Sequence, residues 1–258
     1  YLNRKKYRLR PVRISQKSGW FVNKRRQSPE EALRGVDAAF NAMHGEYGED
    51  GRAQALLEFY GVPYTGSGVA ASALGMNKSV SRNIFKAHGL TTPKTLHLAK
   101  KEYKRDKKAA RYKIFKTHGK GPWVIKPVSC GSSVGVSIVS DPRGIAGALN
   151  RAFHFDDEVL VEEYLRGREL TVPVLEHKRG VATALPVIEI RPRKEKFFDY
   201  KEKYSADGAE EIVPAPLSGH LARKVARAAL IAHQVLVCRG YSRVDSILVK
   251  DTPYILEV

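Results

Sequence analysis

Short apolar runs recur along the chain and are separated by turn-forming residues. Runs of this length, rich in β-branched and aromatic residues and bounded by Gly, Pro, Asn or Asp, predict β-strands. The run at 7–14 alternates apolar and basic residues like a half-exposed strand, whereas the run at 36–43 has the composition of a buried strand. The predicted strands are 7–14, 36–43, 122–128, 135–140, 158–165, 168–176, 182–190, 241–249 and 253–258.

Other segments carry apolar residues at the spacing of an amphipathic helix. Residues 52–60 place Ala53, Leu56, Leu57 and Tyr60 on one side, and Gly61 is a helix stop. The predicted helices are 52–60, a second that follows the turn at 62–68, 78–90, 142–153, which begins with a proline, and 220–236.

Strands and helices therefore alternate, which is typical of an α/β (α+β) protein. Breaks in the pattern near Gly75 and Gly167 predict three subdomains, at 1–75, 76–166 and 167–258. The segment 191–216 is long, polar and interrupted by aromatic residues. Loops of this length are uncommon unless they have a function, so we expect this one to act in a binding site.

The composition is that of a water-soluble globular protein, with 43% hydrophobic and 28% charged residues among 258. No apolar stretch approaches the roughly 20 residues that a membrane helix needs. Cys130 and Cys238 are too few for a disulfide framework or a zinc cluster. We therefore expect a reducing compartment, the cytoplasm, and no membrane partner.

The net charge of +18 comes from two segments. Residues 1–29 contain ten Lys and Arg and no acid, and residues 100–120 contain ten Lys and Arg and two acids. One interpretation is a nucleic-acid or anionic surface, with Tyr103 and Tyr112 between the lysines. The other is two solvated faces. We favour the second, because no nucleic-acid-binding motif accompanies the charge.

The segment 124–136, "VIKPVSCGSSVGV", predicts an anion site. A strand ends in Lys126 and is followed by a loop containing Gly131, Ser132, Ser133 and Gly135. Small residues let backbone N–H groups approach a ligand, and a lysine at the mouth favours a negative one, such as phosphate. The segment matches neither the Walker A nor the dinucleotide-binding glycine pattern, and such a loop alone is more often a turn.

Three further features support a nucleotide site. Lys78 opens a predicted helix, where a second lysine could converge on a polyphosphate. Glu162, Tyr164 and Leu165 could line an adenine slot, with Glu169 near the ribose or a metal, although Tyr164 and Leu165 could equally belong to the core. Asp245 and Glu257 lie among apolar residues on neighbouring strands, and two carboxylates there suit Mg²⁺ bridging phosphates.

Five motifs, in order, resemble the D-alanine–D-alanine ligase family of the ATP-grasp superfamily. The resemblance runs from about Val36 to the end of the chain. The motifs are "HGEYGEDGRAQALLEFYGVPYTGSGVAASALGMNKSVSR" (44–82), "VIKPVSCGSSVGVSIV" (124–139), "LVEEYLRGREL" (160–170), "FFDYKEKY" (197–204) and "CRGYSRVDSILV" (238–249).

The resemblance implies an ATP-grasp fold with three subdomains and ATP between the central and C-terminal ones. It also implies the reaction. ATP phosphorylates the carboxylate of one D-alanine, the amine of a second attacks the acyl phosphate, and phosphate leaves. Mg²⁺ or Mn²⁺ is the implied cofactor, two molecules of D-alanine are the substrates, and the product serves peptidoglycan synthesis. Relatives are usually dimers, so we expect a homodimer and no nucleic-acid partner.

Site roles follow from the family motifs, position by position. Lys78 and Lys126 resemble phosphate-binding lysines, and Ser132 and Ser133 lie in the loop over the phosphates. Arg243 resembles the arginine that stabilises the developing oxyanion, and His44 the histidine near the first D-alanine. The remaining assignments are adenosine contacts at Glu162, Tyr164, Leu165 and Glu169, the γ-phosphate lysine Lys203, the lid tyrosine Tyr204, and the metal ligands Asp245 and Glu257.

In the family, the tyrosine that matches Tyr204 seals the lid by bonding the loop serine, here Ser132, and D-lactate-using relatives lack it. Its presence favours an amine nucleophile. The alternatives are another D-alanine:D-amino or hydroxy acid ligase of the ATP-grasp type, and a basic nucleic-acid-binding module on the same scaffold. The second leaves the joint presence of Lys126, Lys203 and Arg243 unexplained.

The sequence also departs from the family. Asn77 stands where an aspartate usually precedes the first lysine, and Cys130 where a charged residue is common. The family's opening strand, with an acidic residue for the first D-alanine, is missing. So are an asparagine metal ligand and the segment for the second D-alanine's carboxylate, after Val258. We therefore expect the sequence to be part of a longer polypeptide, and little ligase activity from these residues alone.

Overall fold

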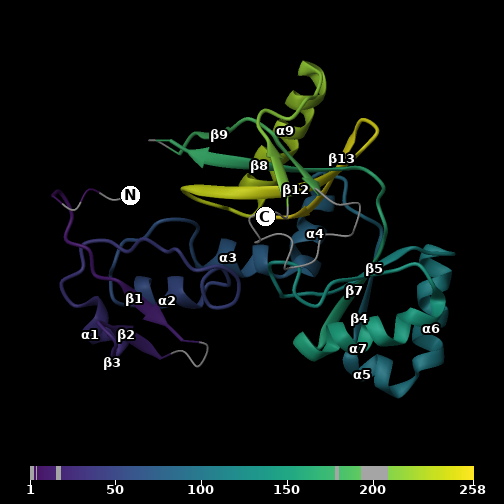
Figure 1. The fold of residues 1–258 in the computed structure, drawn as a ribbon, viewed down its shortest axis with the longest axis horizontal. Helices are drawn as coiled ribbons and strands as arrows, with labels where there is room; N and C mark the ends of the chain where they lie inside the picture. Colours follow the sequence, from purple (N-terminus) through teal and green to yellow (C-terminus); the bar gives the residue numbers. More distant parts are fainter. Residues whose placement is uncertain (1–2, 4, 16–18, 178–179, 193–208) are drawn as a thin grey trace.

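The computed structural model describes residues 3, 5–15, 19–177, 180–192 and 209–258. The described part contains three β-sheets and three separate hydrophobic clusters. In Figure 1 the N-terminal elements lie at the left, the central elements at the lower right, and the C-terminal elements above them.

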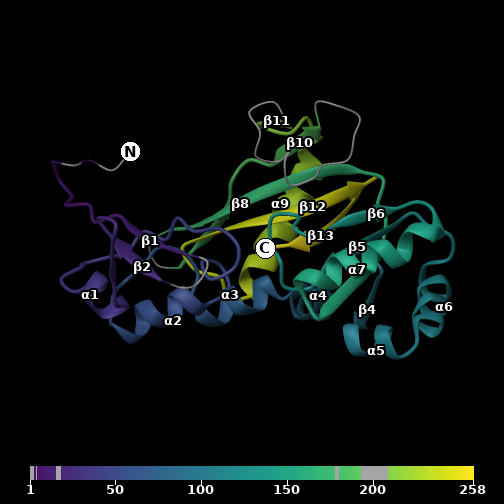
Figure 2. The same cartoon turned by 60° about the horizontal axis from the view of Figure 1, so that its bottom comes forward.

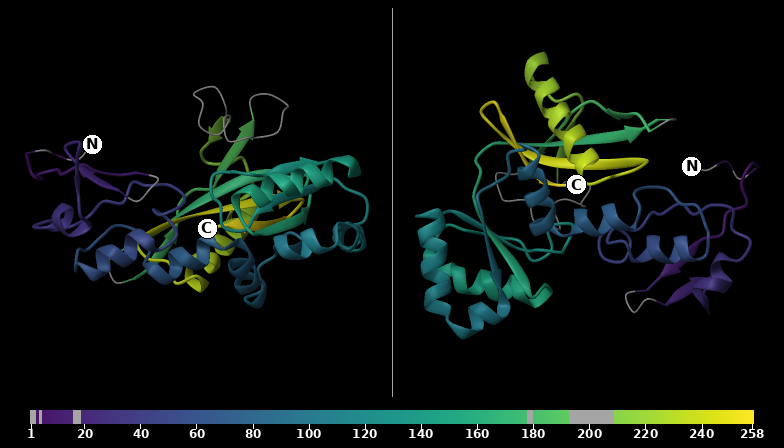
Figure 3. Two further views of the ribbon diagram at one scale, coloured as in Figure 1. Left: turned by 90° about the horizontal axis from the view of Figure 1, so that it is seen from below. Right: turned by 180° about the vertical axis from the view of Figure 1, so that it is seen from behind.

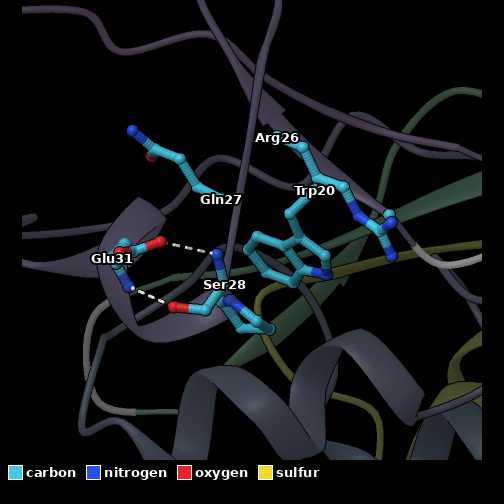
Figure 4. Close-up of a pocket in the computed structure, with 7 residues that line it drawn as sticks. Trp20, Arg26, Gln27, Ser28 and Glu31 are labelled. Carbon is cyan, nitrogen blue, oxygen red and sulfur yellow. Dashed lines mark hydrogen bonds between the residues drawn. The ribbon is translucent and has the colours of Figure 1, made fainter.

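The N-terminal part is built on a small antiparallel sheet in the order β1(Val12–Ile14)–β2(Trp20–Val22)–β3(Arg25–Gln27). Helix α1(Pro29–Leu33) begins with a capping box, because the Ser28 hydroxyl accepts from the Glu31 N–H and the Glu31 carboxylate accepts from the Ser28 N–H. Figure 4 shows both bonds beside the Trp20 indole. Helix α2(Arg52–Phe59) completes this part, and its Leu57 packs in the same cluster as Trp20.

The strand predicted at 36–43 is wrong. Its only β-contact among the described residues is an isolated bridge between Ala39 and Tyr64, and Phe40 is 67% exposed. A strand needs pairing on at least one edge and a core against one face. Val36 and Ala39 pack against the N-terminal cluster, but among the described residues the segment has no pairing beyond this one bridge, so it does not form a strand. Of the strand predicted at 7–14, only Val12–Ile14 forms.

Helices α3(Val69–Met76) and α4(Lys78–Ala87) lead from the N-terminal part toward the central one, and Figure 2 shows α2, α3 and α4 in succession along one side of the molecule. Asn77 separates the last two. Its side-chain oxygen accepts from the backbone N–H groups of Ser79 and Val80, which caps α4.

The central part is an antiparallel sheet of four strands packed against three helices (Figure 1). The strand order is β4(Thr95–Ala99)–β7(Glu158–Glu163)–β5(Trp123–Pro127)–β6(Ser137–Val139). The helices are α5(Lys100–Arg105), α6(Lys107–His118) and α7(Ile145–Phe155), the last preceded by the 3-10 turn η1(Pro142–Gly144). Their apolar side chains, among them Tyr103 and Ile114, form one core with Trp123 and Ile125.

The basic segment 100–120 is thus folded into two helices that no apolar periodicity had predicted. Tyr103, Ala110 and Ile114 are buried, while Lys104, Lys108 and the other basic residues between them are exposed. The helices are therefore amphipathic, and their charge lies on the solvent side.

The C-terminal part is a sheet in the order β11(Ala209–Ile212)–β10(Ile188–Pro192)–β8(Arg168–Glu176)–β12(Tyr241–Val249)–β13(Thr252–Glu257), with β9(Ala182–Ala184) also paired to β8. Helix α9(Gly219–Val235) packs on this sheet in a core with Leu170, Val172, Val244 and Ile255. Figure 3 shows α9 against these strands from two further sides.

The run predicted as one strand at 182–190 is two strands, β9 and β10. The long segment predicted at 191–216 begins at the end of β10 and continues past β11, and these two strands pair so that Glu189 faces Ile212. Residues 193–208 lie outside the described residues. Within the described ranges, no helix has both the length and the apolar character to cross a membrane.

Candidate functional site

Five charged side chains meet where the central and C-terminal sheets approach helix α4. Lys78 and Arg82 come from α4, Lys126 from the end of β5, Glu162 from β7 and Glu257 from the end of β13. The first four are at most 8% exposed. Burying so many charges is costly unless they are paired, so their arrangement is unlike an ordinary core.

Glu162 stands at the centre of this cluster. Its Oε2 lies 3.0 Å from Nζ of Lys126, and its Oε1 accepts from the Arg82 guanidinium. The pKa of Lys126 is lowered to about 8, mainly because burial disfavours the charged ammonium, and also because Arg82 and Lys78 are positive; Glu162 and Glu257 oppose this effect. Lys126 is thus a buried ammonium that loses its proton more easily than an ordinary lysine.

Lys78 connects the loop that follows β5 to the C-terminal sheet. Its Nζ donates to the backbone carbonyl of Cys130 at 2.6 Å and lies 3.1 Å from Oε2 of Glu257. Its own backbone N–H donates to the carbonyl of Val128. The two lysines that the sequence placed on a common phosphate therefore belong to one charge cluster, although they are 48 positions apart in the sequence.

The loop after β5 has an unusual backbone. Ser132 and Ser133 have φ values of 53° and 60°, a left-handed conformation that non-glycine residues rarely adopt. Gly135 has φ 73°, and a side chain there would meet Pro127 and Phe155 at 2.8 Å. Two consecutive strained residues in a loop rich in small side chains are typical of a segment shaped for a ligand. The turn is supported by Val134 N–H donating to the carbonyl of Gly131.

Arg243 and Asp245 lie two residues apart on β12. The guanidinium of Arg243 donates to both oxygens of Asp245, at 3.0 Å each, and Thr171 donates its hydroxyl to Oδ1 of Asp245 at 2.7 Å. The Asp245 side chain is 13% exposed and that of Arg243 is 68% exposed. The arginine therefore reaches toward solvent from a partly buried carboxylate.

Asp245 and Glu257 are register partners across the β12–β13 pairing, next to a bulge between Asp245 and Ser246. No three His, Cys, Asp or Glu residues of the described part form a metal-binding group. Two carboxylates do fit Mg²⁺, because this ion is commonly held by one or two protein carboxylates together with substrate phosphates. The donor set therefore suits a metal that arrives with a nucleotide.

The residues predicted to contact adenosine are found along β7 and β8. The Glu162 side chain is occupied by its two cations, Tyr164 is 38% exposed, and Leu165 and Glu169 are half-buried. Tyr164 and Leu165 lie beyond the end of β7, and neither belongs to the hydrophobic cluster of the central part. Their nucleotide contacts stay predictions.

His44 lies on an exposed loop of the N-terminal part, where its Nδ1 is 3.4 Å from Oε1 of Glu49. The same loop reaches the loop that follows β5, because a side chain at Gly131 would lie 3.6 Å from Cα of Gly45. The structure therefore brings the His44 segment beside the Ser132 loop. Lys203 and Tyr204 lie outside the described residues.

Arg82 was missed by the sequence analysis. It is 2% exposed and donates to three groups from different strands: Glu162, the Thr95 hydroxyl at 3.1 Å, and the carbonyl of Leu256 at 3.2 and 3.3 Å. The available signal was its spacing from Lys78, because residues four apart lie on one face of a helix.

Comparisons with known proteins show the family to which the chain belongs. A family model described as the D-ala D-ala ligase C-terminus matches residues 84–258, and one for the D-ala D-ala ligase N-terminus matches residues 2–67. A D-alanine–D-alanine ligase of Geotalea uraniireducens is 48% identical over 224 residues, which is 86% of this chain and 68% of that protein.

Solved structures extend the likeness to the fold. The D-alanine–D-alanine ligase of Bacillus anthracis complexed with ATP superposes with a TM-score of 0.71 at 36% identity, over 88% of this chain and 69% of that one. The VanG D-Ala:D-Ser ligase of Enterococcus faecalis superposes with a TM-score of 0.73 at 30% identity, over 96% of this chain and 69% of that one. The fold is therefore the ATP-grasp fold, as predicted. The chain belongs to the D-alanine–D-alanine ligase family.

Proposed function

We propose that this protein is an ATP-dependent ligase that joins two D-alanine molecules into D-alanyl-D-alanine for peptidoglycan synthesis. The observation that carries the proposal is the buried cluster of Lys78, Lys126, Glu162 and Glu257 between the two sheets, in a chain that belongs to this family. A carboxylate is a poor electrophile, and phosphorylation turns one of its oxygens into a leaving group. The protein's task is to position the reactants and neutralise charge.

Each described group has a chemical task in this reaction. The ammonium groups of Lys78 and Lys126 bind phosphate oxygens, and the loop with Ser132 and Ser133 covers them. Arg243, exposed at the end of its pair with Asp245, stabilises the negative charge that develops at the reacting carboxylate. Glu162 and Glu169 hold the adenosine side of the nucleotide, with Tyr164 and Leu165 beside the base. His44 orients the first D-alanine.

Asp245 and Glu257 would hold Mg²⁺ or Mn²⁺, and the ion would neutralise part of the charge of the phosphates. On the residues outside the described part, Lys203 would reach the γ-phosphate, and Tyr204 would close the lid over Ser132. The segment 191–216 would then exclude water from the acyl phosphate, which hydrolysis would otherwise destroy.

The direct test is product formation. The protein is incubated with ATP, Mg²⁺ and D-alanine, and both phosphate release and D-alanyl-D-alanine are measured. Phosphate release that depends on D-alanine, with dipeptide in equal amount, is the expected result. Release of phosphate without dipeptide, or no ATP binding at all, would contradict the proposal.

A second candidate is a ligase that uses D-serine or D-lactate as the nucleophile. The likeness to the D-Ala:D-Ser ligase VanG supports keeping it. The same assay with D-serine or D-lactate beside D-alanine separates the candidates. We expect no product with D-lactate, because Tyr204 matches the lid tyrosine of the amine-using enzymes. D-Alanine and D-serine both attack through an amine, so the relative yields of their two dipeptides decide between them.

We also propose subdomains at 1–75, 76–166 and 167–258, a homodimer, and a cytoplasmic location. The three hydrophobic clusters support this division. Phe85 and Leu90, which belong to the central subdomain by sequence, pack in the cluster of the C-terminal part. The family supports the dimer. The two cysteines, Cys130 and Cys238, are both free, which supports a reducing compartment. Sedimentation of the purified protein and cell fractionation test these two statements. We expect no nucleic-acid binding at physiological salt.

A further inference from the structure

Arg82 is the described side chain that joins the charge cluster to both sheets at once. Its guanidinium donates to Thr95 on β4 and Glu162 on β7, which are neighbours in the central sheet. It also donates, through Nε and Nη2, to the carbonyl of Leu256 on β13 of the C-terminal sheet. One planar group thus holds two sheets that come from different parts of the chain.

The residues that Arg82 holds are directly connected to the proposed nucleotide site. Glu162 uses its other carboxylate oxygen for Lys126, and Leu256 precedes Glu257, whose carboxylate pairs with Lys78. A shift of Arg82 would therefore move Lys126 and Glu257 relative to each other. Arg82 itself is 2% exposed, and nothing in its geometry gives it a role in touching a ligand.

We propose that Arg82 is a positioning residue, which fixes the separation of Lys126 on the central sheet from Glu257 on the C-terminal sheet so that both can engage one nucleotide. This inference rests on the proposed function. It assigns to Arg82 a specific duty within that function, as the only side chain of the described part shown here to bridge the Glu162–Lys126 pair and the β13 backbone.

The planar guanidinium is required for this duty. A lysine at position 82 would keep the charge but would offer a single nitrogen, which cannot reach Glu162 and the Leu256 carbonyl with the same fork geometry. A glutamine would keep part of the length and lose the charge. The two variants therefore separate geometry from charge.

The charge of Arg82 also acts on Lys126. The groups that face Lys126 are Arg82 and Lys78 from α4, Glu162 from β7 and Glu257 from β13. Removing the positive charge of Arg82 takes away one cause of the lowered pKa of Lys126 and leaves Glu162 to favour its charged form. The ammonium would then persist to higher pH.

The test is binding of the non-hydrolysable ATP analogue AMP-PNP, with Mg²⁺, by calorimetry at several pH values. For Arg82→Gln we expect affinity at pH 7 to fall about 10- to 100-fold, as is common when a residue that orients a ligand-binding group is removed. We also expect the pH at which affinity declines to move upward. For Arg82→Lys we expect weaker binding than wild type with the pH of decline unchanged.

Arg168→Gln is a matched control. Arg168 makes a two-pronged ion pair with the buried Glu189, at 2.7 and 2.8 Å, but this pair lies within the C-terminal sheet. We expect a lower melting temperature for this variant and no change in the pH at which AMP-PNP affinity declines. Comparing this variant with Arg82→Gln thus distinguishes the general effect of losing an ion pair to a buried glutamate from the specific effect of losing Arg82 as a positioning residue.

The outcomes distinguish this inference from the proposed function. If the wild type fails to bind AMP-PNP, the proposed function fails. If the wild type binds and Arg82→Gln binds equally well, with only a lower melting temperature, Arg82 is structural and the inference is wrong. If Arg82→Gln does not fold, Arg82→Lys decides, because wild-type affinity in that variant would also overturn the inference.

Discussion

Nζ of Lys126 lies 3.0 Å from Oε2 of Glu162, and both side chains are buried at the junction of two strands of the central sheet. The pair is not self-contained, since Glu162 also accepts from Arg82. Removing Lys126 therefore leaves Glu162 with a cationic partner, whereas removing Glu162 would leave two buried cations facing each other. This asymmetry makes Lys126 the better position for probing nucleotide binding without unfolding the protein.

We expect Lys126→Ala to fold and to lose ATP affinity by about 10- to 100-fold, because a hydrogen bond to a charged group contributes about 1.5–3 kcal/mol. Calorimetric titration with ATP measures the loss, and circular dichroism checks the fold. Lys116→Ala, at an exposed lysine of α6, is the control and should bind as wild type. Unchanged ATP affinity in Lys126→Ala would remove Lys126 from the site.

The lowered pKa of Lys126 predicts a pH dependence of binding. Since the pKa is about 8, the ammonium is charged at pH 7 and becomes neutral as the pH rises through 8. ATP affinity should therefore fall progressively between pH 7.5 and 9.5, by roughly tenfold per unit at the upper end if only the charged form binds. Affinity that stays constant to pH 9.5 would contradict this assignment, and Lys126→Ala should lack the decline.

The lowered pKa of Lys126 also affects stability. Its effect on the free energy of unfolding has the opposite pH dependence to its effect on ATP affinity. The unfolded chain holds the Lys126 proton up to its ordinary pKa near 10.5, and the folded chain releases it near 8. Between these values the unfolded state binds more protons, so the contribution of Lys126 to the free energy of unfolding rises with pH. Chemical denaturation at pH 7 and 9.5 should therefore show the free energy of unfolding of wild type increasing relative to that of Lys126→Ala as the pH rises.

Asp245 is predicted to act through a divalent ion. We expect Asp245→Asn to lower the affinity for ATP in the presence of Mg²⁺ by at least about tenfold, because the neutral amide is a weaker ligand for a hard cation. Affinity measured with excess chelator should change much less. Asp251→Asn, at an exposed turn between β12 and β13, is the control. Equal losses with and without Mg²⁺ would argue against metal binding by Asp245.

A glycine substitution in the loop that follows β5 separates the effect of the strained backbone on stability from the effect of the serine hydroxyl on nucleotide binding. Ser133→Gly should keep or slightly raise the free energy of unfolding, because glycine adopts φ 60° without the cost of about 1–2 kcal/mol that a side chain carries. Nucleotide affinity should fall several-fold if the hydroxyl binds phosphate.

Lys24→Gly is the control for Ser133→Gly. Asn23 and Lys24 have φ values of 49° and 66° in the hairpin between β2 and β3, where glycine is favoured at the second position. The Lys24→Gly substitution should therefore stabilise the protein without affecting nucleotide binding. A strong loss of stability in Ser133→Gly, with unchanged affinity, would contradict a binding role for the loop.

Elements with a regular pattern were predicted well from the sequence. Strands 168–176 and 241–249 coincide with β8 and β12, two apolar runs with clear ends that pair with each other over eight residues each, from 168 to 175 and from 241 to 248. The strand at 36–43 was wrong, since apolar composition cannot indicate whether a neighbouring strand is present. Helices α5 and α6 were missed because lysines surround the few apolar residues, Tyr103, Ala110 and Ile114, that anchor them.

The site divides in a similar way. Lys78, Lys126 and Glu257 were identified from motifs, and the structure brings them together. The sequence could not show that Glu162 is shared between two cations, because that depends on the packing of α4 between the sheets. It also could not single out Arg82, whose importance comes from a backbone carbonyl 174 positions away in the chain.

The cap of α4 explains how one departure from the family is tolerated. The side-chain oxygen of Asn77 accepts from the second and third N–H groups of the helix, those of Ser79 and Val80, and an aspartate could accept the same bonds. An amide does so without adding an anion next to Lys78. If Lys78 binds phosphate as proposed, its positive charge is less compensated by its neighbour than it would be with aspartate at position 77, which favours the binding of an anionic ligand.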